Sequence, residues 1–426
     1  MFAIILFIFV LQCATADIYK LSDSDYALMP PRFQMDPYEA CYDDPKGLYC
    51  IVELNLVSDE PSPVLTMIQE YSAYINIHYN HTRLQHGICV TRTCKKLFEE
   101  NKDLRSTLEA YANESLYTKY KLKAKVLEGF DCSTGENDWD IDILDLTVAA
   151  FCIVILCANI IGSIYDYWFL QGKYDGCLRF VLAFSIFRNW RKLVAPQTDD
   201  CDPRLQQLKG LHGIRVLNMC LVIIAHACLV NIITPENPEY IENHIFMAWP
   251  YHIIFNGTVI MQTFLLISAF LLIYNWLLYS EKQKPSWRMV PKIILMRWLR
   301  LTPPYAVILA LTSTWFGRIV YGPYWKKTVF NEISDCRRDW WKHLLYINNY
   351  FDHSECMGQS WYLAVDMQLH WLGIIVFLIC RNRRARNWML TLLFVIGLIL
   401  PTAHTYFQDL SGVLIISPEV ILTLFV

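Results

Sequence analysis

The sequence predicts a mainly α, polytopic helical membrane protein with about six to seven transmembrane helices and a small disulfide-bearing lumenal or extracellular domain. Hydrophobic residues make up 54% of the 426 residues and charged residues only 18%, compared with about 25% charged residues in typical soluble domains. The apolar residues also gather in long uninterrupted blocks. A formal net charge of −3 indicates no nucleic-acid partner, and the apolar content excludes a disordered chain, which buries little apolar surface.

Residues 1–16 have the pattern of a secretory signal peptide. An apolar run over 2–11 is followed by small residues that end in an Ala-Thr-Ala cleavage pattern at position 16. A retained signal anchor is the alternative, but a ten-residue apolar run is short for a helix that crosses a bilayer.

Residues 17–142 contain no apolar block and are expected to form the cysteine-bearing domain. Two acceptor sequons begin at Asn80 and Asn113, which predicts glycosylation and a lumenal or extracellular location. In such a compartment cysteines pair, and the disulfide candidates here are Cys41, Cys50, Cys89, Cys94 and Cys132. A local bridge between Cys89 and Cys94 is the first expectation, and the odd number leaves one cysteine free or paired elsewhere. The leucine spacing predicts a helix over residues 95–128.

From residue 143 onward, apolar blocks alternate with basic patches. We expect a first transmembrane helix within residues 143–165, a cytosolic linker over 166–206 and a membrane module over 207–426. The blocks long enough to be considered as spans are 146–164, 216–233, 253–278, 301–316, 361–380, 388–400 and 414–426, of which the last two are short.

The basic patches predict the orientation of these spans. Clusters of Lys and Arg lie in 173–192, 282–300 and 381–386, and such clusters favour the cytosolic side. The loops 235–244 and 321–360 then lie on the other side, where Cys336 and Cys356 are expected to form a disulfide. Residues 178–194 mix aromatic and basic residues, which predicts a cytosolic helix in the membrane interface. A calmodulin-binding helix would have a similar pattern.

Ionisable residues inside apolar spans are costly and are therefore the first candidates for a functional site. Arg215 and His226 are eleven residues apart and so share one helix face. Asp366 and His370 are four apart on another span. Counting depth from the outer ends of their helices places His226 and Asp366 at one level, where Asp366 would orient the imidazole as a general base. A structural His–Asp pair that joins two helices is the alternative.

A second candidate lies at the cytosolic ends of the spans. Arg297 and Arg300 begin the fourth apolar block near the level of Arg215, and three guanidinium groups at one mouth suit a phosphate-bearing ligand. Interfacial anchoring of the helices is the alternative. The pair Pro303-Pro304 is expected to break the helix there and to free backbone groups near the same mouth.

At these residues the sequence resembles the acyltransferase-three family of integral membrane O-acyltransferases. The resemblance rests on LKGLHGIRVLNMCLVIIAH (208–226), with its Arg, ten residues, His pattern, and on FLLISAFLL, MRWLRLTPPY and SWYLAVDMQL in the family's order. The cysteine-bearing segments GLYC (47–50) and HGICVTRTC (86–94) and the stretch FSIFRNWRKL (184–193) are similar to the nose-resistant-to-fluoxetine proteins, which join such a domain to this module.

The resemblance implies an acyl-CoA co-substrate on the cytosolic side, no metal, and transfer of the acyl group to a hydroxyl of a lipid, sterol-like or carbohydrate acceptor. His226 takes the position of the family's essential histidine, and Asp366 stands where the family usually has Glu. Arg215, Arg297 and Arg300 would hold the CoA phosphates. We expect the polar side chains of Ser268, Tyr305, Gln368 and His370 to contact substrate.

The number of predicted spans leaves the activity open. The family module has about ten spans, so a chain that stops near the sixth of them is expected to be a partial module. A non-catalytic protein that moves lipids or xenobiotics on the same scaffold is therefore the competing hypothesis. The sequence favours a multi-pass protein of the endoplasmic reticulum or the plasma membrane, with membrane lipids and a small lipophilic acceptor as partners, and does not indicate an oligomeric state.

Overall fold

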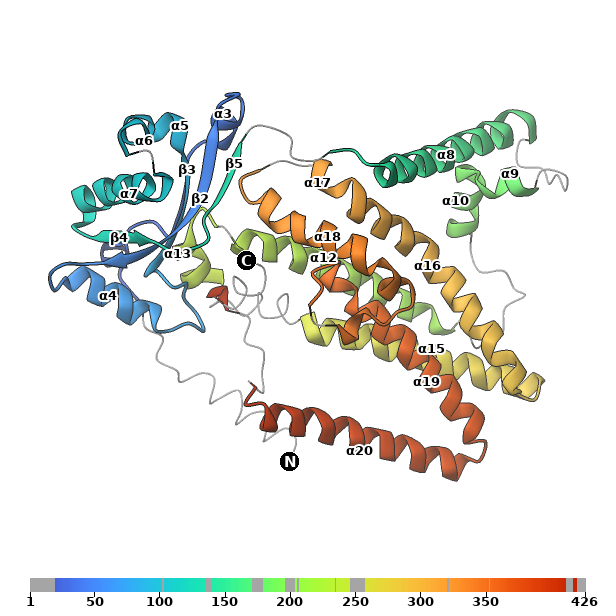
Figure 1. Ribbon diagram of the computed structural model, residues 1–426. Coiled ribbons are helices and arrows are strands. Elements are labelled where there is room, and N and C mark those ends of the chain that lie inside the picture. Colours follow the sequence, from blue (N-terminus) through green and yellow to red (C-terminus); the bar gives the residue numbers. More distant parts are fainter. Residues whose placement is uncertain are drawn as a thin grey trace.

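The computed structural model describes residues 20–101, 103–134, 140–170, 179–195, 204, 207–233, 235–245, 257–319, 322–351, 353–410 and 417–419. The predicted signal peptide lies outside these residues. An N-terminal α/β domain, called the ectodomain here after its predicted location, lies beside a group of long helices that includes α12, α15, α16 and α19 (Figure 1). The fold class is as predicted, a helical membrane protein with a small disulfide-bearing domain.

The ectodomain is built on a five-stranded sheet whose longest strand is at its centre. The strands are β1 (Phe33–Met35), β2 (Leu48–Val57), β3 (Arg83–Cys89), β4 (Lys123–Val126) and β5 (Asp131–Thr134). The order is β1-β3-β2-β4, with β5 also paired to β2. β1 pairs with β3 in parallel, whereas β3, β4 and β5 pair with β2 in antiparallel fashion.

Short helices pack against this sheet and close its core (Figure 1). They are α2 (Asp23–Tyr26), α3 (Tyr38–Tyr42), α4 (Pro63–Ser72), α5 (Val90–Thr93), α6 (Lys95–Asn101) and α7 (Leu104–Tyr120). The predicted helix over 95–128 is too long at its C-terminal end. Lys121 has a left-handed backbone with φ of 56° that ends α7, and the chain then continues into β4, where Leu122 and Ala124 are buried in the core.

Three disulfides are present among the described residues. Cys336 pairs with Cys356 as predicted. The predicted bridge between Cys89 and Cys94 is wrong, because the ectodomain bonds are Cys41–Cys89 and Cys50–Cys132. β5 pairs with β2 so that Cys50 and Cys132 lie directly opposite each other, a register that local spacing does not reveal. Cys94 is buried and free, and burial raises the pKa of its thiol to about 12.

Six described helices are long and apolar enough to cross a membrane. They are α8 (Ile143–Tyr165), α12 (Gly210–Ile233), α15 (Gly257–Lys282), α16 (Val290–Thr314), α19 (Trp361–Ile379) and α20 (Arg383–Phe407). They correspond in order to the first six predicted spans. The seventh predicted span, 414–426, lies outside the described residues except for 417–419. The expected helix break at Pro303-Pro304 is wrong, since α16 continues through both prolines.

Shorter helices connect these six. η1 (Asp166–Leu170), α9 (Arg179–Ala183) and α10 (Ile186–Val194) follow α8, and η2 (Gln207–Lys209) precedes α12. α13 (Pro238–Tyr240) and η3 (Ile241–Ile245) lie between α12 and α15, and η4 (Trp287–Met289) precedes α16. α17 (Phe316–Ile319), α18 (Trp325–Leu344), η5 (Asn348–Tyr350) and η6 (Gly358–Ser360) lie between α16 and α19. α18 packs along α16, and the segment that follows it folds back toward the same helix.

The start of α8 is fixed to the end of α16 by a buried ionic network. Asp145 is fully buried and accepts hydrogen bonds from Arg318 at 3.0 Å and from Arg337 at 2.5 Å. Arg337 also pairs with Asp142, the N-cap residue of α8, and the Trp315 indole donates to the backbone oxygen of Asp145 at 3.0 Å. Removing one partner of such a network leaves a buried charge uncompensated, so we infer that it holds α8 against α17 and α18.

Candidate functional site

The polar centre of the helical group joins three helices through one guanidinium group. Arg297 of α16 pairs with Asp366 of α19 and also donates to the Ser268 hydroxyl of α15 at 3.3 Å. Asp366 is 8% exposed. In surroundings that are otherwise apolar, a carboxylate and a guanidinium are much less costly together than apart. We therefore expect this contact to fix how the three helices are placed relative to one another.

This pairing corrects the predicted contact between Asp366 and His226. His226 is exposed, and its Nδ1 lies 2.9 Å from the backbone oxygen of Val222, one turn earlier in α12. Among the contacts that the structure describes, no hydrogen bond joins His226 to Asp366. The roles predicted for these two residues stay predictions, but the carboxylate serves Arg297 and not the imidazole.

The physical reason is the path of the chain before α19. The prediction placed Trp361 at the outer edge of the membrane and measured the depth of Asp366 from there. Instead, Tyr346, Cys356 and Met357 pack against Tyr305 and Leu309 in the second half of α16. α19 therefore begins beside the middle of α16, and Asp366 lies level with Arg297.

The three predicted phosphate-binding arginines have different surroundings. Arg297 is committed to Asp366. Arg215 is half-buried in α12 and lies close enough to Tyr362 to act on it electrostatically, as Asp366 and Arg297 also do. Arg300 is exposed, and the described contacts give it no carboxylate partner. The structure thus brings Arg215 toward the polar centre and leaves Arg300 one turn beyond it.

One turn after Asp366, His370 presents an unsatisfied polar group. Both of its ring nitrogens are buried, and neither has a hydrogen-bond partner among the described residues. The indole nitrogen of Trp371 and Nε of Arg297 are also buried and also have no hydrogen-bond partner among the described residues. Buried polar atoms are normally paired, so these four atoms mark the place where a ligand or a further segment would supply hydrogen bonds.

Tyr305 and Gln368, which are predicted to contact substrate, make hydrogen bonds to the segment that connects α16 to α19. The Tyr305 hydroxyl lies 2.8 Å from Nδ1 of His343, and the Ser360 hydroxyl lies 3.3 Å from the same nitrogen. Gln368 donates to the backbone oxygen of Tyr346 at 2.8 Å and to the Asn349 amide oxygen at 2.8 Å.

Sequence reasoning missed His343, which is the hub of this second cluster. It is almost completely buried, and burial is the main cause that lowers its pKa, opposed by the nearby Asp339. Asp339 is also buried, and hydrogen bonds from Arg338 and Lys342 hold the pKa of its carboxyl well below the usual range. The signal that could have found it is the spacing of Asp339 and His343, four apart on a helix between two cysteines that pair.

A third polar cluster, centred on Glu242, joins the ectodomain to the helices and was also missed. Glu242 of η3 is fully buried and accepts hydrogen bonds from the hydroxyls of Tyr26 and Tyr71, both at 3.1 Å, and from the backbone N–H of Tyr79 at 2.6 Å. The His81 ring lies 3.0 Å from it. Burial, followed by the charge of Glu242, raises the pKa values of Tyr26, Tyr71 and Tyr79.

The same junction reaches α12 directly. The Tyr79 hydroxyl donates to the backbone oxygen of Ile232 in the last turn of α12 at 2.7 Å. The helix that carries Arg215 and His226 is thus held by the ectodomain at one end.

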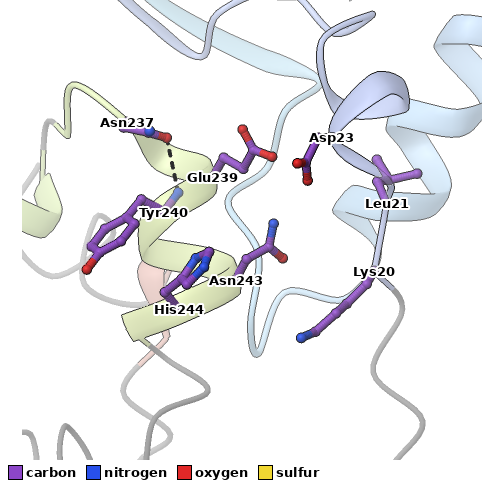
Figure 2. Close-up of a pocket in the computed structure, with 8 residues that line it drawn as sticks. All are labelled: Lys20, Leu21, Asp23, Asn237, Glu239, Tyr240, Asn243 and His244. Carbon is purple, nitrogen blue, oxygen red and sulfur yellow. Dashed lines mark hydrogen bonds between the residues drawn. The ribbon is translucent and has the colours of Figure 1, made fainter.

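Beside the junction lies a cavity of about 340 Å³ between the ectodomain and the α13–η3 segment. Figure 2 shows Asp23 and Glu239 reaching toward each other across it. Burial, with a further contribution from Asp23, raises the pKa of Glu239. On the other side, the rings of Tyr240 and His244 stack at 5.0 Å. The remaining lining residues are Lys20, Leu21, Asn237 and Asn243.

Comparison with known proteins shows which protein families the chain is similar to. Residues 208–419 match the acyltransferase domain family. The chain is also 26% identical over 326 residues to the protein named nose resistant to fluoxetine protein 6 of Caenorhabditis elegans, a match that covers 69% of this chain and 38% of that relative. The chain is similar to the nose-resistant-to-fluoxetine proteins and carries an acyltransferase-family membrane module over residues 208–419. It spans less than half the length of the curated relative that it matches. No solved structure matches it.

Within the acyltransferase-family module, the matched residues include Arg215, His226, Ser268, Arg297 and Asp366. The ectodomain, with its two disulfides and the tyrosines that surround Glu242, lies before the matched range. In the part of the chain that the structure describes, no group of three or more His, Cys, Asp or Glu side chains is arranged to hold a metal ion.

Proposed function

We propose that the module transfers an acyl group from acyl-CoA to a hydroxyl of a lipid, sterol-like or carbohydrate acceptor, with His226 as the general base. The observation that carries the proposal is the match of residues 208–419 to the acyltransferase domain family. In this proposal His226 acts on the acceptor hydroxyl, and the arginines bind or position the acyl-CoA.

The contact of His226 with its own helix defines which ring nitrogen would act. The backbone oxygen of Val222 only accepts hydrogen bonds, so the Nδ1 that lies 2.9 Å from it carries a proton. In the neutral imidazole that a general base requires, Nε2 is then the nitrogen with a free lone pair. In this proposal a backbone carbonyl does what Asp366 was expected to do, because it fixes the tautomer of the base.

The reaction step follows from that tautomer. His226 Nε2 takes the proton of the acceptor hydroxyl while the hydroxyl oxygen attacks the thioester carbonyl. The new C–O bond forms, the C–S bond breaks, and the CoA thiolate leaves and takes up the proton. Arg215 and Arg300, which pair with no carboxylate among the described residues, would hold the CoA phosphates, whereas Arg297 would shape the site through Asp366 and Ser268.

Substitution of His226 by Ala in the full-length protein tests this function. The measurement is transfer of a radiolabelled acyl group from acyl-CoA in membranes that contain the protein and supply its acceptor. We expect a loss of about 10²–10⁴-fold, the usual contribution of a general base. His404→Ala, which removes an exposed histidine from α20, is the matched control. Unchanged transfer by His226→Ala at equal expression would refute the proposal.

The competing function is movement of lipids or xenobiotics without catalysis. The separation of His226 from an orienting carboxylate favours it, since catalytic histidines usually have such a partner. It predicts that His226→Ala moves a fluorescent phospholipid between membranes as fast as the unaltered protein, whereas the enzyme hypothesis predicts that acyl transfer is lost.

We also propose that the ectodomain is lumenal or extracellular, in the endoplasmic reticulum or at the plasma membrane. Its two disulfides support an oxidising compartment. The Asn113 amide oxygen accepts from the backbone N–H of Ala124 at 2.7 Å, which leaves the amide nitrogen available for a glycan. Asn80→Gln and Asn113→Gln should each remove part of the gel-mobility shift that enzymatic deglycosylation produces.

A further inference from the structure

We propose that the hairpin of α9 and α10 is a binding surface for anionic phospholipid. The surface lies at the C-terminal end of α8, where this helix leaves the membrane. The surface is defined by the apolar side chains Phe180, Ile186, Phe187, Trp190 and Leu193 together with the cations Arg191 and Lys192. It lies at the end of α8 remote from the ectodomain (Figure 1). The inference is independent of acyl transfer.

The hairpin is fixed to α8 and is not a loose tether. The Ser163 hydroxyl accepts from the backbone N–H of Ile186 at 3.0 Å. Asp166, 1% exposed, accepts from the Ser185 hydroxyl at 2.9 Å and from Arg188 at 2.8 Å. Gly162 allows the approach, because a Cβ at this position would lie 2.5 Å from the backbone oxygen of Val181.

This attachment places α10 beside the last turn of α8, where a span meets the interface. Tyr167, Trp168 and Phe169 follow in η1 and are 62–74% exposed. Aromatic side chains gather at this depth because one part of the ring is apolar and another part reaches water. α10 therefore lies at the level of lipid headgroups.

The apolar face of α10 has no described protein partner. Phe187, Trp190 and Leu193 are 52%, 64% and 77% exposed, and their spacing of three residues puts them on one side of the helix. The neighbouring helix α8 is exposed on all sides, and its residues Val154 and Leu156 are 65% and 62% exposed. Because α8 is a membrane span, the occupant that continues along it is lipid.

The charges select the kind of lipid. Asp166 satisfies Arg188, which is 16% exposed, but it also reaches Arg191 at 3.3 Å while that side chain remains 59% exposed. Lys192 is exposed, and no hydrogen bond or ion pair of its side chain is seen among the described residues. Asp166 thus pairs with two of the three cations Arg188, Arg191 and Lys192, and the surplus positive charge lies at headgroup depth. Each such cation adds about 1 kcal/mol of attraction to an anionic membrane surface.

The test is thermal unfolding of the purified full chain in detergent, titrated with phosphatidylglycerol, phosphatidylcholine or inorganic phosphate. We expect phosphatidylglycerol to raise Tm in a saturable way and the other two to leave it unchanged. The double variant Arg191→Gln/Lys192→Gln should need about tenfold to thirtyfold more phosphatidylglycerol for half of the effect. Lys95→Gln/Lys96→Gln, which removes two adjacent cations from the ectodomain, is the matched control and should behave as the unaltered chain.

Two further measurements distinguish a loss of lipid binding from a folding defect of the double variant. Lys192→Gln alone, which breaks no described contact, should still weaken the lipid effect about fivefold. The difference in fluorescence between the unaltered chain and Trp190→Phe should be quenched by brominated acyl chains and not by aqueous acrylamide. Equal Tm shifts with phosphatidylcholine, a shift with inorganic phosphate, an unaltered response of the double variant, or a Ca²⁺-dependent complex of α10 with calmodulin would each overturn the proposal.

Discussion

The ectodomain and the membrane helices differ in the interactions that stabilise each of them internally. The ectodomain encloses an apolar core in which Val52, Leu54, Ile68 and Leu84 are completely buried. Among the membrane helices, the apolar side chains of α8 and α20 face outward, and almost none of the residues of these two helices are buried. Where α15, α16 and α19 meet, the module buries apolar side chains together with the polar Arg297–Asp366 contact. In water, apolar burial stabilises a fold. In lipid it contributes little between helices, and paired polar groups fix the arrangement.

The largest effect that this comparison predicts comes from Asp366→Ala. The variant leaves Arg297 without its partner among apolar helices, which we expect to cost about 4 kcal/mol of unfolding free energy. The double variant Arg297→Met/Asp366→Leu should recover most of this loss, because it removes both charges. Denaturant unfolding of the full chain in mixed micelles measures both. A double variant as unstable as the single one would show that the ion pair does not matter in this way.

A matched pair of leucine substitutions sharpens the comparison. Leu54→Ala empties a fully buried site in the ectodomain core and should cost about 3 kcal/mol. Leu156→Ala removes the same atoms from the lipid-facing side of α8, where the side chain is 62% exposed, and should change the stability by less than about 0.5 kcal/mol. The same denaturant titration reports both. Equal losses would mean that α8 is packed against protein and not against lipid.

The smallest effect is a pH dependence that involves the His343 cluster. Burial lowers the pKa of His343 in the fold below its ordinary value of 6.5. The unfolded chain therefore takes up a proton that the folded one does not, and stability falls as the pH drops below about 6.5. We expect the Tm to decrease between pH 7.5 and 5.5, and the decrease to be smaller in His343→Gln. His353→Gln, at an exposed position, should keep the full dependence.

The parts of the fold that depend on local pattern could be predicted from the sequence. Six apolar blocks became six candidate spans, and Cys336 and Cys356, which flank one short segment, pair as expected. The ectodomain bonds were not predictable, because a sheet register brings Cys50 to Cys132 over 82 residues. Pro303 and Pro304 show the same limit, since neighbouring helices can compensate for the lost backbone hydrogen bonds.

The candidate site was predicted in its residues but not in its contacts. Ionisable residues in apolar spans identified Asp366 and Arg297. Their pairing depends on the depth at which α19 begins, and this depth is set by tertiary packing of Tyr346 and Met357 on α16. Glu242 carried no signal at all, because it is one of three glutamates in a short connection and nothing in the sequence distinguishes it from Glu236 and Glu239.

The Glu242 junction has a consequence for biosynthesis. Tyr26, Tyr71 and His81 are made 216, 171 and 161 residues before the carboxylate that satisfies them. At the usual 5–20 residues per second, these three groups remain without the Glu242 carboxylate for roughly 10–40 s after their own synthesis. During this interval Tyr26, Tyr71 and His81 lack their hydrogen-bond partner. Glu242 follows α12 in the chain. The polar groups of the ectodomain at this junction are therefore satisfied only after α12 has been made.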